Sequence, residues 1–449
     1  MKPKLIGLFL IVGIIPLAIT GWWSAQLATE ALMEKSYGQL EAVRGIKKGQ
    51  IEKYFEERQG DMGVLMETVG TLRKESFAKL EAIQVIKKNQ VEGYFNERLG
   101  DASVLAGNSV VFDAINAFES AFVANGDKTG GSKWNSVEDR YAPWLIQYKE
   151  EYGYYDLFLI AEGGDVVYTV SKESDLGENI IEGSLRDSSL AQCFKTALKG
   201  AALSDFAPYA PSNNEPCAFV GAPVKKGGKT IGAVVLQLSL DAINSIMQER
   251  TGMGESGEVY LVGSDKLMRS DSFLDPQNHS VNASFADPGK GSVETDASSN
   301  ALAGKSAKEV ILDYNGNPVL SAYGPLEIEG LKWAIIAEMD VSEAFCPKDE
   351  SGKYFYEKYQ QMYGYYDLFL FNPDGYCFYT VAQEADYQTN FVSGKYSSSN
   401  LGKLVRNVLS TKQFGMADFA PYAPSNGDPC AFVAQPVVNS GKVEVVVAL

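Results

Sequence analysis

Three side chains with complementary chemistry recur at helical spacing in the first third of the chain. Arg140, Trp144 and Tyr148 stand at positions i, i+4 and i+8, so on a helix they would share one face. A guanidinium can hold a carboxylate through two parallel N–H bonds, and aromatic rings can wall a small cavity. This face is therefore a candidate site for a small molecule that carries a carboxylate.

A second group of polar side chains lies in segments that alternate as β-strands do. Tyr154 and Asp156 share one face of the first segment, while Tyr155, Leu157 and Leu159 share the other. An aspartate here could neutralise an ammonium group. The candidate ligand contacts on the strand side are Tyr155, Asp156, Tyr168, Asp205 and Tyr209. A structural interpretation stays open for each, because Asp205 before Phe-Ala-Pro could fix a turn and buried tyrosines are often core residues.

The strand segments belong to a stretch that occurs twice. Tyr152–Val170 (YGYYDLFLIAEGGDVVYTV) returns as Tyr363–Val381 (YGYYDLFLFNPDGYCFYTV), identical at 12 of 19 positions. Asp205–Phe219 returns as Asp418–Phe432, identical at 13 of 15 positions. The offsets of 211 and 213 residues predict one duplicated module with a small insertion.

The second copy repeats the strand candidates but changes the helix opposite. Its candidates are Tyr366, Asp367, Tyr379 and Asp418. Ser351 and Phe355 take the places of Arg140 and Trp144. We therefore expect that the two copies do not bind the same ligand, or that only one of them binds. Specificity would then depend on what differs between the copies, and the repeated stretches would form the sheet framework.

The elements that must position these residues are of mixed type. For the first module the pattern predicts a loop over 126–132, a helix over 137–148 with a break at Pro143, and a hairpin of 154–160 with 166–170. A helix over 189–199 and strands near 203–206, 217–223 and 230–238 follow. This order is typical of a PAS-like α+β sheet. A second, different module follows, with a helix over 241–250, strands at 257–262, 267–270, 310–314, 318–323 and 333–339, an Asn-Gly turn at 315–316, and a long loop with a short helix over 272–308.

An apolar run and a helical repeat precede these modules. Leu5–Trp23 is 19 uncharged residues behind two lysines, which predicts a transmembrane helix with the rest of the chain outside the cytoplasm; a cleaved signal peptide is the alternative. Leu40–Arg58 returns as Leu80–Arg98, identical at 12 of 19 positions and amphipathic in both copies. On one helix from Ser24 the rod would be on the order of 120 Å long. Glycines at 60, 63 and 70 also allow a hairpin. A signal-carrying stalk, a spacer and a dimer seam all fit this pattern.

Composition excludes several classes of function. The net charge is −17 and no Lys/Arg-rich run occurs, so nucleic acid is not an expected partner. His279 is the only histidine, and the five cysteines (Cys193, Cys217, Cys346, Cys377 and Cys430) form no Cys-x-x-Cys motif. We therefore expect no metal, no cofactor and no Ser-His-Asp or Cys-His hydrolase. Cys217 and Cys430 are equivalent positions, which favours a shared buried role over a bridge between them. A remote alternative is an extracytoplasmic hydrolase that uses Asp156, Asp205 and Tyr209 with their copies as carboxylate pairs.

The motifs together resemble a known family. The anchor, the IKKxQIExYFxER helices, YGYYDLFLI, DFAPYAPS, the run IMQERTGMGESGEVYLVGSDKLMRSDSFLDPQNHSV and DYNGNPVLSAY are similar to the extracytoplasmic sensor region of bacterial methyl-accepting chemotaxis proteins with double Cache domains. The resemblance implies PAS-like sensor modules, a small polar ligand (an amino acid, organic acid or amine), and a homodimer. It also implies that the protein is not an enzyme. The R-x-x-x-W spacing differs from the R-x-W-Y of the family's amino-acid binders, which weakens an assignment to amino acids.

The expected organisation has five parts. They are a cytoplasmic tip and transmembrane helix (1–23), a helical stalk (24–109), a membrane-distal-type Cache module (110–240), a membrane-proximal-type module (241–344), and a second distal-type copy (345–449). By the 213-residue offset Leu449 aligns with Leu236, inside a strand, so we expect this second copy to be truncated. If the duplication is complete in the full gene, a fourth module should follow Leu449. The sensor could alternatively serve a histidine kinase or a diguanylate cyclase.

Overall fold

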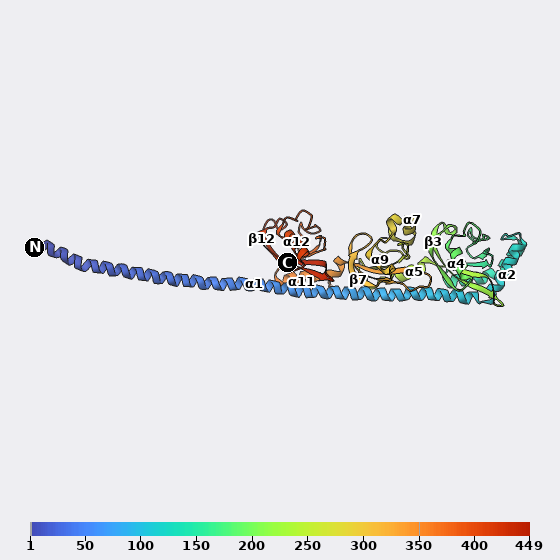
Figure 1. Ribbon diagram of the computed structural model, residues 1–449, viewed down its shortest axis with the longest axis horizontal. Coiled ribbons are helices and arrows are strands. Elements are labelled where there is room, and N and C mark those ends of the chain that lie inside the picture. The colour runs from blue at the N-terminus through green and yellow to red at the C-terminus, as the bar shows by residue number, and fades with distance from the viewer. Residues whose placement is uncertain (1, 350) are drawn as a thin grey trace. The chain divides into compact units, whose positions relative to one another are not determined.

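The computed structural model describes residues 2–349 and 351–449. Two compact units divide the chain, one made of Met1–Thr68 with Gln360–Leu449 and the other of Val69–Tyr359. Helix α1 (Lys2–Ala106) contributes to both units and continues without a break (Figure 1). The hairpin that the glycines allowed is not formed. Met62 and Leu65 are fully buried beside these glycines, so packing offsets the roughly 1 kcal/mol that each glycine costs in a helix.

The first module is an antiparallel sheet with helices on both faces. Its strand order is β2-β1-β5-β4-β3. The strands are β1 (Asp156–Ala161), β2 (Val166–Thr169), β3 (Ala202–Tyr209), β4 (Glu215–Lys226) and β5 (Lys229–Gln237), with the short 3₁₀ turn η1 (Ala210–Ser212) after β3. Helix α4 (Ser189–Ala197) packs on the face that carries Phe158 and Ile160. Because side chains alternate along β1, Leu157 and Leu159 lie on the opposite face, toward α2.

Helices α2 (Ser109–Ala124) and α3 (Gly131–Glu151) cover that opposite face. Phe118 of α2 stacks on Tyr168, and the Trp134 indole of α3 donates to the carbonyl of Val167 at 3.2 Å. The predicted break at Pro143 was wrong, because α3 runs through it. Buried Ala142 and Leu145 hold the helix on both sides of the proline. The predicted loop is also shorter, since α3 starts at Gly131.

The second module has a sheet of order β6-β9-β8-β7. Its strands are β6 (Glu258–Gly263), β7 (Ala307–Leu312), β8 (Pro318–Pro325) and β9 (Trp333–Asp340), flanked by α5 (Leu240–Met247) and α10 (Val341–Phe345). The Asn-Gly hairpin between β7 and β8 is confirmed. Two predictions were wrong. The segment 267–270 forms only one bridge, Val262 to Met268, and the long polar stretch folds into α6 (Pro276–His279), α7 (Val281–Ala286), α8 (Pro288–Gly291) and α9 (Asp296–Leu302).

The third module repeats the sheet of the first. Its strand order is β11-β10-β14-β13-β12, and α12 (Asn400–Thr411) covers one face. The strands are β10 (Phe369–Phe371), β11 (Cys377–Thr380), β12 (Gly415–Pro421), β13 (Pro429–Asn439) and β14 (Lys442–Ala448). Phe369 faces Ala448 as Phe158 faces Val235, so the register of the duplication is preserved. Within the described residues, α11 (Phe355–Tyr363) stands in the chain where the first module has α2 and α3.

Candidate functional site

Asp156 closes the open end of the first hairpin. Its buried carboxylate accepts from the backbone N–H groups of Leu157 at 2.6 Å and Ser171 at 2.9 Å, and from the Thr169 hydroxyl. Burial raises the pKa of the Asp156 carboxyl, and these three donors oppose that rise. The side chain therefore pins the chain after β2 to the start of β1.

Glu173 connects the hairpin to the opposite edge of the sheet. The Tyr155 hydroxyl donates to Glu173 Oε1 at 2.9 Å, and the Ser212 hydroxyl donates to Glu173 Oε2 at 2.8 Å. The bond to Glu173 raises the pKa of Tyr155 to about 12. Gln237, at the end of β5, donates to Ser212 Oγ at 3.4 Å. The carboxylate of Glu173 thus joins three segments that are far apart in sequence.

Asp175 is a fully buried acid beside this group. The Tyr209 hydroxyl donates to its Oδ2 at 2.8 Å, and burial, with the nearby Asp156 charge, raises the pKa of Asp175 to about 6. Asp175 Oδ1 and Gln237 Oε1 are buried and have no hydrogen-bond donor among the described residues. We call Tyr155, Asp156, Glu173, Asp175, Tyr209, Ser212 and Gln237 the acidic network. With two unused buried acceptors, it is suited to a ligand that donates hydrogen bonds and carries positive charge.

A shallow hollow opens beside the acidic network at Tyr155. The residues that line it are Lys149, Glu150, Gly153, Tyr154, Tyr155, Ser171 and Ser239. They come from the end of α3, the connection from α3 to β1, the segment after β2 and the connection to α5. Tyr155 belongs to both the hollow and the network, because its ring is exposed to solvent while its hydroxyl donates to Glu173.

The helix candidates only partly approach this region. Arg140 is exposed and its guanidinium lies 5.0 Å from the ring centroid of Tyr141. Trp144 packs against Tyr148, which stacks on Tyr152 at 4.4 Å and donates to the Asp101 carbonyl at 3.4 Å. Tyr148 therefore lies at the end of α3 near the hollow. Arg140 lies two turns of helix away.

Two strand candidates lie away from the acidic network. Tyr168 faces α2 and α3 and is fully buried, and its hydroxyl has no hydrogen-bond partner among the described residues. Asp205 faces the second module, where Arg269 Nε and Nη2 donate to its two oxygens at 2.7 and 3.0 Å and the Trp333 indole donates at 2.9 Å. Asp205 thus joins two modules through a buried arginine.

The third module reproduces the network almost atom for atom. Tyr366 donates to Glu384 at 2.6 Å, Ser425 donates to Glu384 at 2.8 Å, and Tyr422 donates to Asp386 at 2.6 Å. Asp367 accepts from Thr380 and from the Leu368 and Ala382 backbone, and burial raises its pKa to about 6. Tyr379 is buried like Tyr168, whereas Asp418 is exposed. As in the first module, one buried acid oxygen, Asp386 Oδ1, lacks a donor among the described residues.

A cavity of about 370 Å³ lies between this network and α1. Tyr54, Phe55 and Arg58 of the helix line it, together with Ser425 and Leu449 of the module. Leu449 holds the register position of Leu236 in the first module.

Sequence reasoning did not include Glu173, Asp175, Ser212 and Gln237 in the site. Their signal was present in the duplication. The acids at 173 and 175 recur at 384 and 386, and Ser212 recurs as Ser425. Polar residues that a duplicated segment retains around a strand end could have been identified as one cluster.

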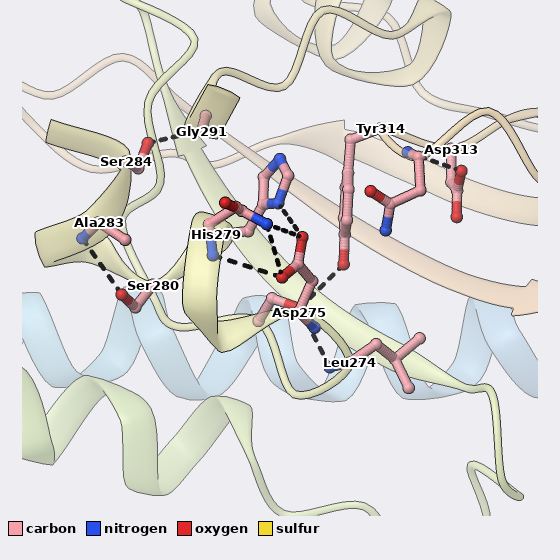
Figure 2. Close-up of polar contacts among 12 residues, drawn as sticks. Leu274, Asp275, His279, Ser280, Ala283, Ser284, Gly291, Asp313 and Tyr314 are labelled. Carbon is pink, nitrogen blue, oxygen red and sulfur yellow. Dashed lines mark hydrogen bonds and ion pairs between the residues drawn. The ribbon is translucent and has the colours of Figure 1, made fainter. Parts of the chain in front are cut away.

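The second module contains its own buried polar group around His279. The imidazole Nδ1 lies 2.9 Å from Asp275 Oδ2, and the ring stacks on Tyr314 with centroids 4.0 Å apart (Figure 2). Tyr314 donates to Glu258, while Tyr260 donates to Glu338, whose pKa burial raises to about 8. His279 is therefore a buried residue. Over residues 2–349 and 351–449, no group of three or more His, Cys, Asp or Glu side chains could hold a metal ion, and the five cysteines are free.

The N-terminal part of α1 is the one described helix that is long and apolar enough to cross a membrane. Its most apolar window has a mean hydropathy of 2.3, and none of that window is buried within the protein. The side chains from Leu5 to Trp23 are mostly exposed.

Comparisons with known proteins agree with this architecture. A family model described as Cache domain, dCache_1, matches residues 30–347. The match covers most of the helix and the first two modules. A search of curated proteins finds no match.

Ligand-binding and sensor domains are among the solved structures that match this chain. The ligand-binding domain of the Pseudomonas fluorescens chemoreceptor CtaA in complex with L-leucine is 15% identical, over 62% of this chain and 99% of that chain, with a TM-score of 0.38. The Campylobacter jejuni chemoreceptor Tlp3 domain in complex with 4-methylisoleucine is 11% identical, over 62% and 96%, with a TM-score of 0.43. The sensor domain of the V. cholerae histidine kinase DctB is 13% identical, over 62% and 97%, with a TM-score of 0.36.

Proposed function

Because the chain belongs to the Cache-domain family, we propose that it is the ligand-sensing region of a transmembrane chemoreceptor whose first module binds a small metabolite with an ammonium group. Cache domains are extracytoplasmic sensor domains rather than catalysts. The apolar start of α1 supports a membrane anchor, with the modules on the far side of the bilayer from the two N-terminal lysines.

One observation carries the choice of ligand. Asp175 is fully buried and one of its carboxylate oxygens has no donor among the described residues. Because its pKa is raised only to about 6, most of this carboxyl is ionised at pH 7. A buried charge without a full set of donors is unfavourable, and an ammonium group would supply both donors and opposite charge. An amino acid or amine therefore fits better than a purely anionic acid.

The first module also has a feature that the described residues of the third do not repeat. Helix α3 contributes Lys149 and Glu150 to the wall of the hollow. This difference favours the first module as the binding copy. The shared acids would then accept the ammonium group, and the surrounding helix would select the rest of the ligand.

A thermal-shift and calorimetric screen of amino acids, amines and organic acids tests this proposal on the full chain in detergent. We expect an amine-containing ligand to raise Tm, with affinity at least about tenfold weaker in Asp175→Asn. Affinity should also fall between pH 7 and pH 5, because protonation of Asp175 removes the charge that attracts the ligand.

Matched variants separate the two copies and the helix. Asp386→Asn, the same change in the third module, should leave binding unchanged. Arg140→Ala should matter only if the ligand also carries a carboxylate within reach of α3. A ligand whose affinity is unaffected by Asp175→Asn would show that the acidic network is not its site. Loss of binding in Asp386→Asn alone would assign the ligand to the third module instead.

A further inference from the structure

The two copies of the α1 repeat have different surroundings. Val91 and Phe95 in the second copy are at most 1% exposed. Their counterparts in the first copy, Ile51 and Phe55, are 57% and 40% exposed. The side chains are of the same kind at each position, so the sequence of the first copy specifies a buried face that is open to solvent in this structure.

The second module is what buries the second copy. Lys87 Nζ donates to the Ile246 carbonyl, and Lys88 Nζ donates to the Pro325 carbonyl at 2.9 Å. The Trp333 ring packs edge-on against Phe95, with centroids 5.2 Å apart. Lys47 and Lys48, at the positions of Lys87 and Lys88, are exposed.

The same contrast holds on the sheet side. Phe206 of β3 is 3% exposed because it stacks on Trp333, and Asp205 beside it receives Arg269. In the third module Phe419 is 67% exposed and Asp418 is also exposed. The partners of Asp205 and Phe206 in these contacts, Arg269 and Trp333, both belong to the second module.

Helix α1 contacts the first and the third module in the same way. The exposed face of the first helix copy and the exposed residues of β12 therefore form one surface. Tyr154 donates to Asp101 at 2.8 Å beside Arg98, and Tyr365 donates to Asp61 at 2.8 Å beside Arg58. The helix positions differ by 40 residues and the tyrosines by 211, which are the offsets of the two duplications. We call Lys47, Lys48, Ile51, Phe55, Asp418 and Phe419 the repeat face. It is the counterpart of the surface that holds the second module.

We infer that the repeat face binds another module of the second type, joined in cis to the third module as the second module is joined to the first. Such a module would present an indole to Phe55 and Phe419, a guanidinium to Asp418, and backbone carbonyls to Lys47 and Lys48. Charge complementarity favours this occupant over a second copy of the helix. A helical seam would use the apolar positions but would leave the lysines and Asp418 without the partners that their counterparts have.

One position departs from the copy. Arg44 stands where buried Gln84 faces the second module. Ten of the sixteen positions from Leu40 to Phe55 are nevertheless identical to those from Leu80 to Phe95, including both lysines and the phenylalanine. The module that fits the repeat face should therefore differ from the second module near this arginine.

A transplant within the full chain tests whether the first copy can hold such a module. The residues from Leu80 to Phe95 are replaced by the sequence from Leu40 to Phe55, and amide hydrogen exchange is measured in β9 and α5. We expect rates within about threefold of the parent, whereas Phe95→Ser in the same transplant should accelerate them by about tenfold or more. A transplant that exchanges as fast as its Phe95→Ser version would overturn the inference.

An extended chain tests the face itself. A copy of Gln237–Cys346 is added after Leu449, which holds the register position of Leu236. Amides of 40–55 and of β12 should exchange about tenfold or more slowly. Asp418→Arg should remove this protection. In that variant, an aspartate in place of the arginine that corresponds to Arg269 in the added module should restore the protection.

Two results of the second experiment would contradict the inference. The added module could protect its own amides while the repeat face exchanges as before. Alternatively, the parent chain could gain protection of 40–55 with rising protein concentration and lose it in Ile51→Glu, which would identify a second copy of the chain as the occupant. Where the added copy does not fold, the transplant decides.

Discussion

The first and third modules share an interior and differ in what covers it. Both hold a threonine-bound aspartate, a tyrosine and serine on one glutamate, and a tyrosine on a second aspartate. Only the first carries α2 and α3 and receives the buried arginine of a neighbouring module, among the residues described. The duplicated motifs therefore encode the sheet framework and the acidic network. Partner contacts and selectivity depend on residues outside them.

The largest predicted difference concerns Asp205 and its copy. Asp205→Ala leaves Arg269, which is 1% exposed, without its bidentate partner, and should destabilise the Val69–Tyr359 unit by about 3 kcal/mol. Asp418→Ala removes an exposed side chain and should change stability by less than about 0.5 kcal/mol. Urea unfolding followed by hydrogen exchange in each unit measures both. Equal effects of the two substitutions on the free energy of unfolding would show that Asp205 and Asp418 contribute alike despite their different surroundings.

The next prediction concerns one buried acid in each interior: Asp175 in the first module and Asp367, the copy of Asp156, in the third. Burial raises the pKa of Asp175 and of Asp367 from the usual aspartate value of 3.8 to about 6. The folded state then binds more protons than the unfolded chain between about pH 4 and pH 6, so each carboxyl's contribution to stability is present below this window and is lost as pH rises through it. The loss should reach up to about 3 kcal/mol per carboxyl.

Module-resolved hydrogen exchange from pH 4 to pH 7 provides the measurement, after correction for the intrinsic exchange rate. Asp175→Asn and Asp367→Asn should each flatten the profile of their own module and leave the other unchanged. A slope that survives both substitutions would have to come from other buried acids, and would contradict its assignment to Asp175 and Asp367.

The smallest predicted effect concerns how the helix is held. Tyr154→Phe and Tyr365→Phe each remove one hydrogen bond to an aspartate of α1, and each should cost about 1 to 2 kcal/mol. Similar losses of unfolding free energy in the two variants, measured by denaturant titration, would support the view that helix and module duplicated as a matched pair. A loss in only one of the two variants would contradict that view.

Much of the sheet architecture could be predicted because its signals are local. Alternating residues, the repeated YGYYDLFL stretch and the Asn-Gly turn predicted most of the strands and their order along the chain. The continuous helix could not be chosen over a hairpin, because buried Met62 and Leu65 outweigh the helix propensity of the nearby glycines. Similarly, Pro143 appeared as a break because its effect on α3 depends on tertiary packing.

The candidate site was harder to predict because its bonds connect distant residues. Tyr155 and Asp156 came from the strand pattern, but their relation to Glu173 and Gln237 depends on the register of β1 and β5. The pairing of Asp205 with Arg269 spans 64 residues and two modules, and nothing near Asp205 in sequence indicates it. The contribution of Arg140 to binding stays a prediction.

The order of the docking pairs along the chain has a consequence for how the protein is made. The helix copy that comes first holds the module that comes last, so the two contacts are nested: Asp101 meets Tyr154 across 53 residues, and Asp61 meets Tyr365 across 304. The inner contact can form while the ribosome is still translating the second module, but the outer one must wait until the third module has emerged. A nested order also cannot come from tandem copying of one contiguous segment, because that would place each helix directly before its own module. It is the order expected when one helix-and-module unit is inserted inside another.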